Sequence, residues 1–321
     1  MELPTLDARP HLVIAGASGL IGRRLIAELQ GRWRVTVLTR EVSGAEATGA
    51  TPLAWTPTAA KDGDRAHLEG LSRVLEGAGA LVNLAGSPIA AGRFGAEHRR
   101  RIRDSRVDST TTLVEAAARC ERPPAVWLQA SGTSIYGDRG DEPLDERSEL
   151  GNDFLAEVGR AWEQAAASAA ARSRLVICRT GIVLDREAEA WRRLVLPVRL
   201  FVGGPIGGGR QWWPWIHASD LTRALTFLLE HGEAEGVFAL TAPEPARQID
   251  LTRAAARVLR RPALVPVPAF ALRIVFGGMA DALLLPSVRL LPTRLLEHGF
   301  AFDYPNATSA AEELLAPARE S

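Results

Sequence analysis

A glycine-rich segment near the start of the chain constrains the possible folds more than any other feature. Residues 12–15, Leu-Val-Ile-Ala, form a short apolar run. Three glycines follow that run at intervals of three residues, at Gly16, Gly19 and Gly22. Residues 20–30 have apolar side chains at helical spacing, and residues 34–40 alternate like a second strand. A strand, a glycine turn, a helix and a strand in about thirty residues indicate a dinucleotide-binding fold.

Each glycine of this segment has a physical role in such a fold. Gly16 permits the tight exit from the strand, Gly19 lets the backbone approach a pyrophosphate, and Gly22 lets the helix pack close to the sheet. Free N–H groups at the helix N-terminus then bind the phosphates. The alternative is a glycine turn of a generic α/β protein. The dinucleotide interpretation predicts these phosphate-binding residues: Gly16, Ser18, Gly19, Leu20, Ile21 and Gly22.

The end of the second strand indicates which nucleotide binds. A carboxylate at this place usually accepts the ribose hydroxyls of NAD, whereas an arginine suits the 2′-phosphate of NADP. Here Arg40 ends the strand and Glu41 follows it. We therefore predict NADP, with NAD as the second choice; in the alternative, Arg40 is solvated and Glu41 binds the ribose.

Strand and helix patterns alternate through the first half of the chain. Further strands are expected at residues 80–86, 125–130, 174–184 and 236–241, with helices at 97–118 and 154–171. This alternation predicts an α/β fold with a right-handed, doubly wound parallel sheet. Ligands bind at the carboxyl ends of such strands. We therefore expect three residues there to contact the ribose and adenine of the cofactor: Leu84, Ala85 and Gly86.

The pattern changes after residue 184, which predicts a second, smaller unit. We assign residues 1–184 to the dinucleotide-binding domain and expect residues 212–241 to return to it. Residues 185–211 and 242–321 then form a smaller C-terminal substrate lobe. Within this part we expect a helix at 187–201 interrupted at Pro197, and a helix whose N-cap is Ser219 or Asp220.

Charge and cysteine content exclude several classes. The chain has 38 basic and 38 acidic residues, and the zero net charge argues against a nucleic-acid or anionic-membrane partner. Cys120 and Cys178 lie far apart, and the chain shows no metal-ligand motif, so no metal is expected. The chain starts without a signal-peptide pattern and has no apolar run of 18 residues. We expect a soluble cytoplasmic protein, a monomer or homodimer.

Several longer motifs resemble one known family. They include GASGLIG at 16–22, NLAG at 83–86, YGDRGDEPL at 136–144 and GGRQWWPWIH at 208–217. Together they resemble the epimerase-like atypical short-chain dehydrogenases/reductases, which have their own C-terminal domain, over nearly the whole chain. The resemblance implies NAD(P) binding by a Rossmann domain. It also implies contacts to the nicotinamide side of the cofactor from these residues: Ser131, Thr180, Gly181, Ile182 and Val183.

The catalytic pair of the wider superfamily is missing. Standard members use a tyrosine with a lysine four residues later, and the lysine lowers the tyrosine pKa. Here the only tyrosines are Tyr136 and Tyr304, and the lone lysine, Lys61, follows neither. The resemblance puts the pair near Leu155 and Gly159, and puts Gly132 where a substrate-orienting serine would stand. Proton transfer must then use other groups.

Tyr136 is the first candidate for such a proton donor. Its position near the nicotinamide suggests a donor whose pKa is lowered by Arg106 or Arg139. In the alternative, Tyr136 is a loop residue packed under the cofactor with its hydroxyl bound to the backbone. His217 is a second candidate acid, with a hydrogen-bonded structural role as its alternative.

Substrate contacts are expected from three residues. Arg210 lies in a glycine-rich loop and suits an anionic group, and Thr133 follows the strand that bears Ser131. Trp212 suits stacking on a flat or sugar-like ligand, unless it packs in the core. The leading function is an NADP-binding oxidoreductase or epimerase-like enzyme for a small polar substrate. The alternative is a non-catalytic NADP-binding module that reports cofactor state to a protein partner.

Overall fold

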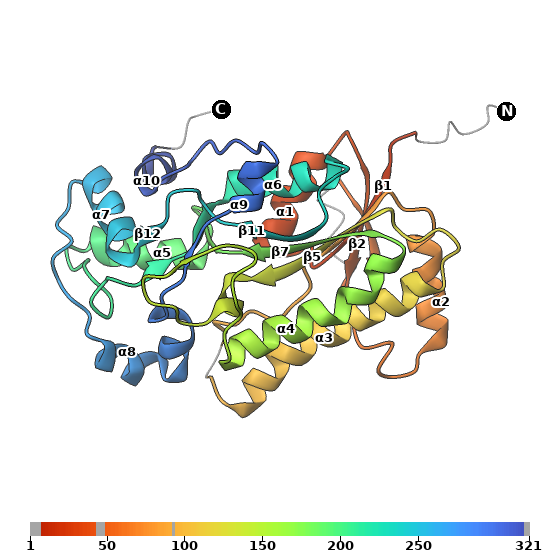
Figure 1. The fold of residues 1–321 in the computed structure, drawn as a ribbon, viewed down its shortest axis with the longest axis horizontal. Coiled ribbons are helices and arrows are strands. Elements are labelled where there is room, and N and C mark those ends of the chain that lie inside the picture. The colour runs from red at the N-terminus through yellow and green to blue at the C-terminus, as the bar shows by residue number, and fades with distance from the viewer. Residues whose placement is uncertain (1–7, 43–48, 92–93, 318–321) are drawn as a thin grey trace.

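Seven parallel strands form the central sheet of the protein (Figure 1). The computed structural model describes residues 8–42, 49–91 and 94–317. The strand order is β11-β7-β5-β4-β1-β2-β3, and every neighbouring pair runs parallel. The strands are β1 (His11–Ala15), β2 (Arg34–Thr39), β3 (Thr51–Ala54), β4 (Ala80–Asn83), β5 (Val126–Gly132), β7 (Arg174–Thr180) and β11 (Gly236–Leu240).

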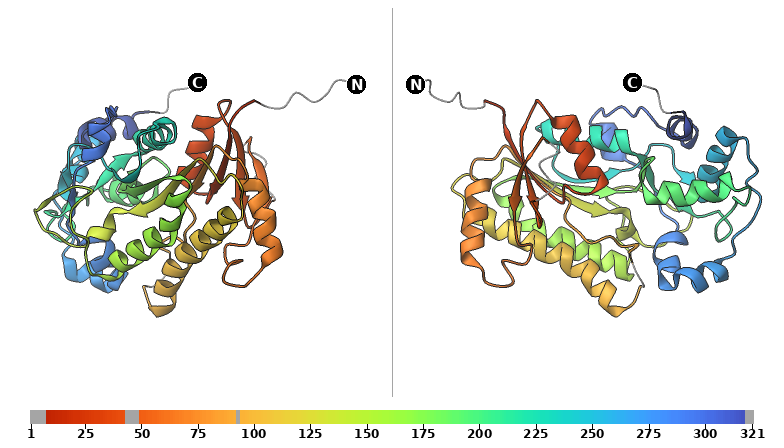
Figure 2. Two further views of the ribbon diagram at one scale, coloured as in Figure 1. Left: turned by 45° about the vertical axis from the view of Figure 1, so that its right-hand side comes forward. Right: turned by 180° about the vertical axis from the view of Figure 1, so that it is seen from behind.

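Helices cover both faces of this sheet, as the apolar runs of its central strands require. One face carries α1 (Leu20–Leu29) and α6 (Ala218–Glu230); the other carries α2 (Arg65–Leu75), α3 (Ala96–Ala118) and α4 (Phe154–Ala166) (Figure 2). A separate cluster of buried apolar side chains fills each interface. The predicted doubly wound fold is therefore confirmed. Parallel strands joined through helices bring all their carboxyl ends to one edge.

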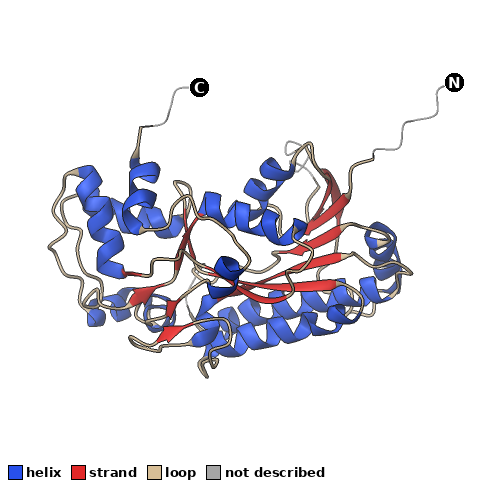
Figure 3. Ribbon diagram, turned by 45° about the horizontal axis from the view of Figure 1, so that its top comes forward, coloured by secondary structure: helices blue, strands red, loops and turns tan. Residues whose placement is uncertain are grey.

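The second half of the chain adds short strands and helices beyond that edge (Figure 3). They include β8 (Ile182–Leu184), β9 (Trp212–Trp213), β10 (Trp215–His217), β12 (Ala246–Arg247), α5 (Glu189–Arg199), α7 (Gln248–Leu259), α8 (Ala269–Phe276) and α10 (Ala307–Leu315). A third apolar cluster packs α5, α7 and α10 around Trp213 and Trp215. Shorter elements complete this part: β6 (Pro143–Leu144) pairs with β13 (Arg289–Leu290), η4 (Ala280–Leu284) follows α8, and α9 (Thr293–Glu297) follows β13.

Two local predictions for this half differ from the structure. Pro197 lies inside α5, which continues for two more residues and ends at Arg199. The fixed φ of proline suits a helix, and the missing N–H bond falls close to the end of α5. The N-cap of α6 is His217, whose side chain accepts from the N–H of Ser219. Asp220 is instead fully buried and accepts the N–H groups of Asp303 and Tyr304, both at 2.9 Å.

Candidate functional site

The glycine turn after β1 lies tightly against its neighbours. Gly16 has a φ of +83°, and a Cβ atom on it would stand 2.6 Å from the carbonyl carbon of Leu84. A Cβ on Gly22 would stand 2.5 Å from the Cα of Ala17. Real side chains do not tolerate such distances from backbone atoms, so only glycine allows this turn to close against β4 and α1.

Gly19, by contrast, has room for a Cβ atom. The nearest atom to a Cβ on Gly19 would be the carbonyl oxygen of Gly16 at 3.6 Å, and both Gly19 and Ser18 are exposed. Helix α1 begins here with no side-chain cap and no acidic residue in its first turn. The first N–H groups of a helix have no partner within the helix, and the helix dipole favours an anion beside them. The turn therefore has the form that a pyrophosphate needs.

The other predicted cofactor residues lie on adjacent strand ends. Leu84 follows β4, which pairs with β1, and the Leu84 N–H donates to the Ala15 carbonyl at 2.8 Å. Gly132 ends β5 opposite Thr180 of β7. Strands β4, β5 and β7 are consecutive in the sheet, so these residues border one edge with the glycine turn. Asn83 fixes the turn after β4, because its Oδ1 accepts the Ala85 N–H at 3.1 Å.

Two arginines lie near this edge. Arg40 follows β2 directly and is exposed. Arg23, which sequence reasoning did not select, lies on α1 and donates to the Ser18 carbonyl at 2.8 Å. It also pairs with Glu187 at 2.9 Å, and so connects the glycine turn to the segment after β8. Its helical position gave no signal of that role in the sequence.

Tyr136 has a different partner from the two that the sequence suggested. It ends the 3₁₀ turn η2 (Thr133–Tyr136) and is fully buried. Its hydroxyl accepts a 2.8 Å hydrogen bond from Nη1 of Arg179. Burial raises the pKa of Tyr136 to about 12, although the charge of Arg179 acts in the opposite direction. A phenol that is buried and this weakly acidic does not suit proton exchange with a ligand.

Arg179 joins Tyr136 to a buried ionic network. Its Nε and Nη2 each donate at 2.9 Å to the carboxylate of Glu163 on α4. The Ser131 hydroxyl donates to the same carboxylate at 2.6 Å, so its side chain points into the helix layer. Burial alone lowers the pKa of Arg179, but the hydrogen bonds and charge of Glu163 raise it overall. The guanidinium stays charged, and the network holds η2 against α4.

Arg106 and Arg139 are occupied elsewhere. Nη1 of Arg106 donates at 3.0 Å to the carbonyls of Ser87 and Ile102, and its Cζ lies 4.9 Å from the Trp162 ring centroid. The Arg139 guanidinium binds the carboxylate of Glu142. Both guanidinium groups are thus bound to other partners, and the hydrogen-bond donor to Tyr136 is Arg179.

Arg106 is unusual for a buried cation. It is 9% exposed, and the partners that its guanidinium has among the described residues are backbone carbonyls and an aromatic ring, with no carboxylate. Burial lowers its pKa to about 10, which still leaves it charged at neutral pH. A Cβ on Gly86 would stand 3.2 Å from its Cζ, so the cation lies directly beneath the turn after β4. Two backbone carbonyls and the Trp162 ring contact this cation, but no carboxylate of the described residues does so at the edge where the cofactor residues gather.

The candidate residues of the second half are largely committed to internal contacts. Nδ1 of His217 accepts the Ser219 N–H at 3.2 Å, and its Nε2 lies 3.0 Å from Glu313, so both ring nitrogens have partners. Trp212 binds Asp141 at 2.7 Å through Nε1, and the guanidinium groups of two arginines lie over its ring. Arg210 is exposed, and Thr133 is buried.

Comparisons with known proteins identify the family. A sequence model of the NAD dependent epimerase/dehydratase family matches residues 12–158, and one described as a domain of unknown function (DUF1731) matches residues 267–314. The chain is 33% identical to the Arabidopsis thaliana protein named "Epimerase family protein SDR39U1 homolog, chloroplastic", over 96% of this chain and 88% of that protein. The chain belongs to the epimerase family.

Solved structures of family proteins have the same fold. The crystal structure of human epimerase family protein SDR39U1 with NADPH gives a TM-score of 0.84 at 29% identity, and covers 95% of this chain and 98% of that one. The nucleoside-diphosphate sugar epimerase of Corynebacterium glutamicum gives 0.72 at 32% identity, with 96% of this chain and 58% of that chain covered. The family resemblance predicted from the sequence motifs is confirmed.

In this epimerase-family chain, the place expected for the tyrosine–lysine pair is filled by apolar packing. Leu155 is 4% exposed. A Cβ on Gly159 would stand 2.9 Å from Cγ1 of Ile135 in η2, so α4 and η2 meet too closely for a lysine at position 159. The pair is absent from the sequence, and the contact of α4 with η2 leaves no room for a lysine side chain at position 159.

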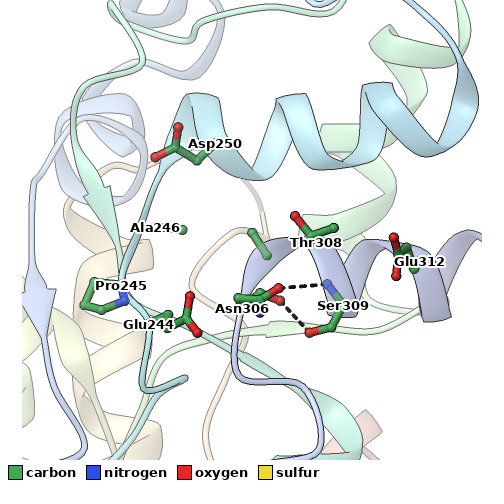
Figure 4. Close-up of a pocket in the computed structure, with 9 residues that line it drawn as sticks. Glu244, Pro245, Ala246, Asp250, Asn306, Thr308, Ser309 and Glu312 are labelled. Carbon is green, nitrogen blue, oxygen red and sulfur yellow. Dashed lines mark hydrogen bonds between the residues drawn. The ribbon is translucent and has the colours of Figure 1, made fainter.

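A pocket in the described part of this epimerase-family protein lies away from the sheet edge. It has a volume of about 520 Å³ and lies between α7 and α10, bordered by Glu244, Asp250 and Glu312 (Figure 4). None of its lining residues follows β1, β4, β5 or β7. In the described residues, no group of three or more His, Cys, Asp and Glu side chains is arranged to hold a metal ion.

Proposed function

We propose that this chain binds NADPH across the carboxyl ends of β1, β4, β5 and β7, as an oxidoreductase or epimerase-like enzyme for a small polar substrate. The observation that carries the proposal is the open N-terminus of α1. Gly16 and Gly22 close the turn against the backbone, while Gly19 has no atom within 3.5 Å of its Cβ direction. This combination leaves amide N–H groups free for a pyrophosphate.

The choice of NADPH over NADH rests on Arg40. An exposed guanidinium directly after β2 suits a 2′-phosphate, because arginine binds phosphate through two parallel hydrogen bonds. The human relative with TM-score 0.84 was crystallised with NADPH, which supports the same nucleotide for this chain.

A bound nicotinamide nucleotide supplies or accepts a hydride. The residues of this chain orient it: the glycine turn holds the phosphates, and Gly132 and Thr180 border the nicotinamide end. Tyr136 stays neutral and bound to Arg179, so it does not move the accompanying proton. We propose that this proton comes from water or from the substrate itself.

Arg106 supports an anionic ligand group at this edge. A buried cation without a carboxylate is unfavourable by several kcal/mol unless a ligand compensates it. A phosphate or carboxylate close to Gly86 would do so, because Gly86 is exposed and lies against the guanidinium. We therefore assign Arg106 to ligand binding and not to the activation of Tyr136.

The second candidate is a non-catalytic NADPH-binding module that acts through a protein partner. The closed contact between α4 and η2 favours it, because the superfamily's proton-transfer pair is replaced by buried packing. The two functions share the cofactor and differ in the substrate. An oxidoreductase oxidises bound NADPH stoichiometrically with a polar carbonyl compound, which the loss of NADPH absorbance measures. An epimerase returns the hydride to its substrate, so formation of the epimeric product measures its activity, and a non-catalytic module gives neither signal.

An Arg40→Ala variant tests the nucleotide assignment. We expect NADPH to bind roughly ten- to a hundredfold more weakly, the range for a charge-assisted hydrogen bond, while NADH affinity stays the same. Arg34→Ala, an exposed arginine at the other end of β2, is the matched control and should change neither affinity. Equal NADPH binding by Arg40→Ala and the parent protein, in fluorescence titrations, would contradict the 2′-phosphate assignment.

A further inference from the structure

Most of the exposed large apolar side chains in the described residues lie at one end of the molecule. They belong to three segments, residues 196–202, 264–265 and 270–275, which we call the apolar end. Leu264 is 80% exposed, Ile274 79% and Val275 73%. Elsewhere in the described residues, only Val42 and Leu296 are large apolar side chains with comparable exposure. Exposed apolar patches of this kind mark interaction surfaces.

Backbone contacts bring these segments together. The N–H of Val265 donates to the Gly203 carbonyl at 3.0 Å, and the N–H of Gly207 donates to the Val267 carbonyl at 2.9 Å. The guanidinium of Arg261 lies 4.0 Å from the Phe201 ring centroid. Helix α8 begins at Ala269, two residues after Val267. All three segments lie at the left end of the molecule in Figure 1.

The charge around the apolar end is strongly positive. Residues 190–219 and 251–280 contain nine arginines, and acidic residues flank these stretches at Glu189, Asp220, Asp250 and Asp281. Two of the nine are paired with these acids, Arg193 with Glu189 and Arg273 with Asp281. Arg199, Arg260 and Arg261 are exposed beside the apolar side chains. The net charge of the chain argues against an anionic membrane, but the charge distribution in the folded protein reverses that argument for this end.

A second copy of the chain does not fit this surface. A symmetric dimer would place the same arginines against each other, and like charges disfavour that contact. Apolar side chains ringed by arginines instead match the interface of an anionic bilayer, where the apolar groups enter the acyl boundary and the arginines contact lipid phosphates. In the described part of the chain, no helix has the length and apolar character to cross a membrane.

We propose that the apolar end docks on an anionic lipid surface. Its side chains enter the headgroup region, and Arg199, Arg260 and Arg261 bind the anionic headgroups. None of these residues belongs to the loops that follow β1, β4, β5 and β7. The inference is therefore independent of the proposed nucleotide function.

Vesicle sedimentation of the full chain tests this proposal. We expect binding to vesicles that contain phosphatidylglycerol, no binding to phosphatidylcholine alone, and weaker binding as salt rises. Arg260→Gln with Arg261→Gln should lower the vesicle partition about thirtyfold, from about 1 kcal/mol per arginine. Ile274→Ser should also lower it.

The matched control removes two exposed arginines from α2, at the opposite end of the molecule, by Arg65→Gln with Arg73→Gln. It has the same net charge as the test variant and should bind vesicles like the parent protein. Thermal melting and NADPH titration verify that each variant is folded. Three results would overturn the proposal: no binding of the folded parent to any vesicle, equal binding to neutral vesicles, or a concentration-dependent dimer that Ile274→Ser abolishes without any lipid binding.

Discussion

The glycine turn and the contact between η2 and α4 border the same edge of the sheet but differ in what they leave open. In the glycine turn, backbone atoms approach so closely that Gly16 and Gly22 admit no side chain, yet Gly19 has room for a Cβ atom. At the η2–α4 contact, Gly159 meets the side chain of Ile135, and Tyr136 is buried.

This difference separates two functions that standard members of the superfamily combine. Close backbone packing at the glycine turn presents N–H groups to a ligand, whereas close side-chain packing at the η2–α4 contact removes the groups that would exchange protons. The glycine turn thus keeps the form of a nucleotide site, whereas the neighbouring η2–α4 contact stabilises the folded protein. Substitutions in the two regions test that contrast.

Glu163→Gln should have the largest effect on stability. It leaves the buried Arg179 without its carboxylate, and breaking such a pair typically lowers the free energy of unfolding by about 3–5 kcal/mol. Urea denaturation measures the loss. Glu69→Gln, an exposed carboxylate on α2, is the control and should change it by less than about 0.5 kcal/mol. A Glu163→Gln protein as stable as the parent would show that the η2–α4 contact does not depend on this network.

Substitutions of two glycines should separate folding from binding in the glycine turn. Gly16→Ala places a Cβ at positive φ and against Leu84, so we expect the free energy of unfolding to fall by about 2 kcal/mol or more. Gly19→Val meets no atom closer than the Gly16 carbonyl oxygen at 3.6 Å, but it replaces the N-cap of α1, so the free energy of unfolding should fall by only about 1 kcal/mol. NADPH should bind at least about tenfold more weakly, because the side chain occupies the phosphate position. If Gly19→Val and the parent protein bound NADPH with equal affinity, the pyrophosphate would not bind at this turn.

Tyr136→Phe should have the smallest effect, about 1 kcal/mol, since Arg179 loses one hydrogen-bond acceptor. The raised pKa adds a pH dependence. Because the folded-state pKa of about 12 exceeds the ordinary value of 10, the neutral phenol stabilises the folded protein below pH 10, and this contribution is lost as pH rises towards 12. The parent protein should unfold at a higher urea concentration than Tyr136→Phe, and this difference in urea midpoint should shrink between pH 9 and pH 11. An advantage that grows over this range would indicate a phenol with a lowered pKa.

The fold class and the tight glycine turn after β1 followed from the amino-acid sequence alone. Both depend on local patterns: the apolar run before Gly16, the three-residue spacing of the glycines, and the alternation of strands with helices. Helix α3 was predicted to within one residue, because a long regular pattern depends little on distant contacts. The absence of a Tyr-x-x-x-Lys pair also followed from the sequence, because it needs only the positions of three residues.

Contacts between distant segments were decided only by the tertiary structure. The partner of Tyr136 is 43 residues away on β7, and the sequence offered Arg106 and Arg139 as equally plausible cations. The role of His217 depends on Glu313, 96 residues later. The apolar end unites segments that lie more than sixty residues apart, so a net charge of zero concealed the exposed arginines that lie beside it, Arg199, Arg260 and Arg261. Local backbone preference is encoded in short stretches, whereas the environment of a side chain depends on which distant elements pack around it.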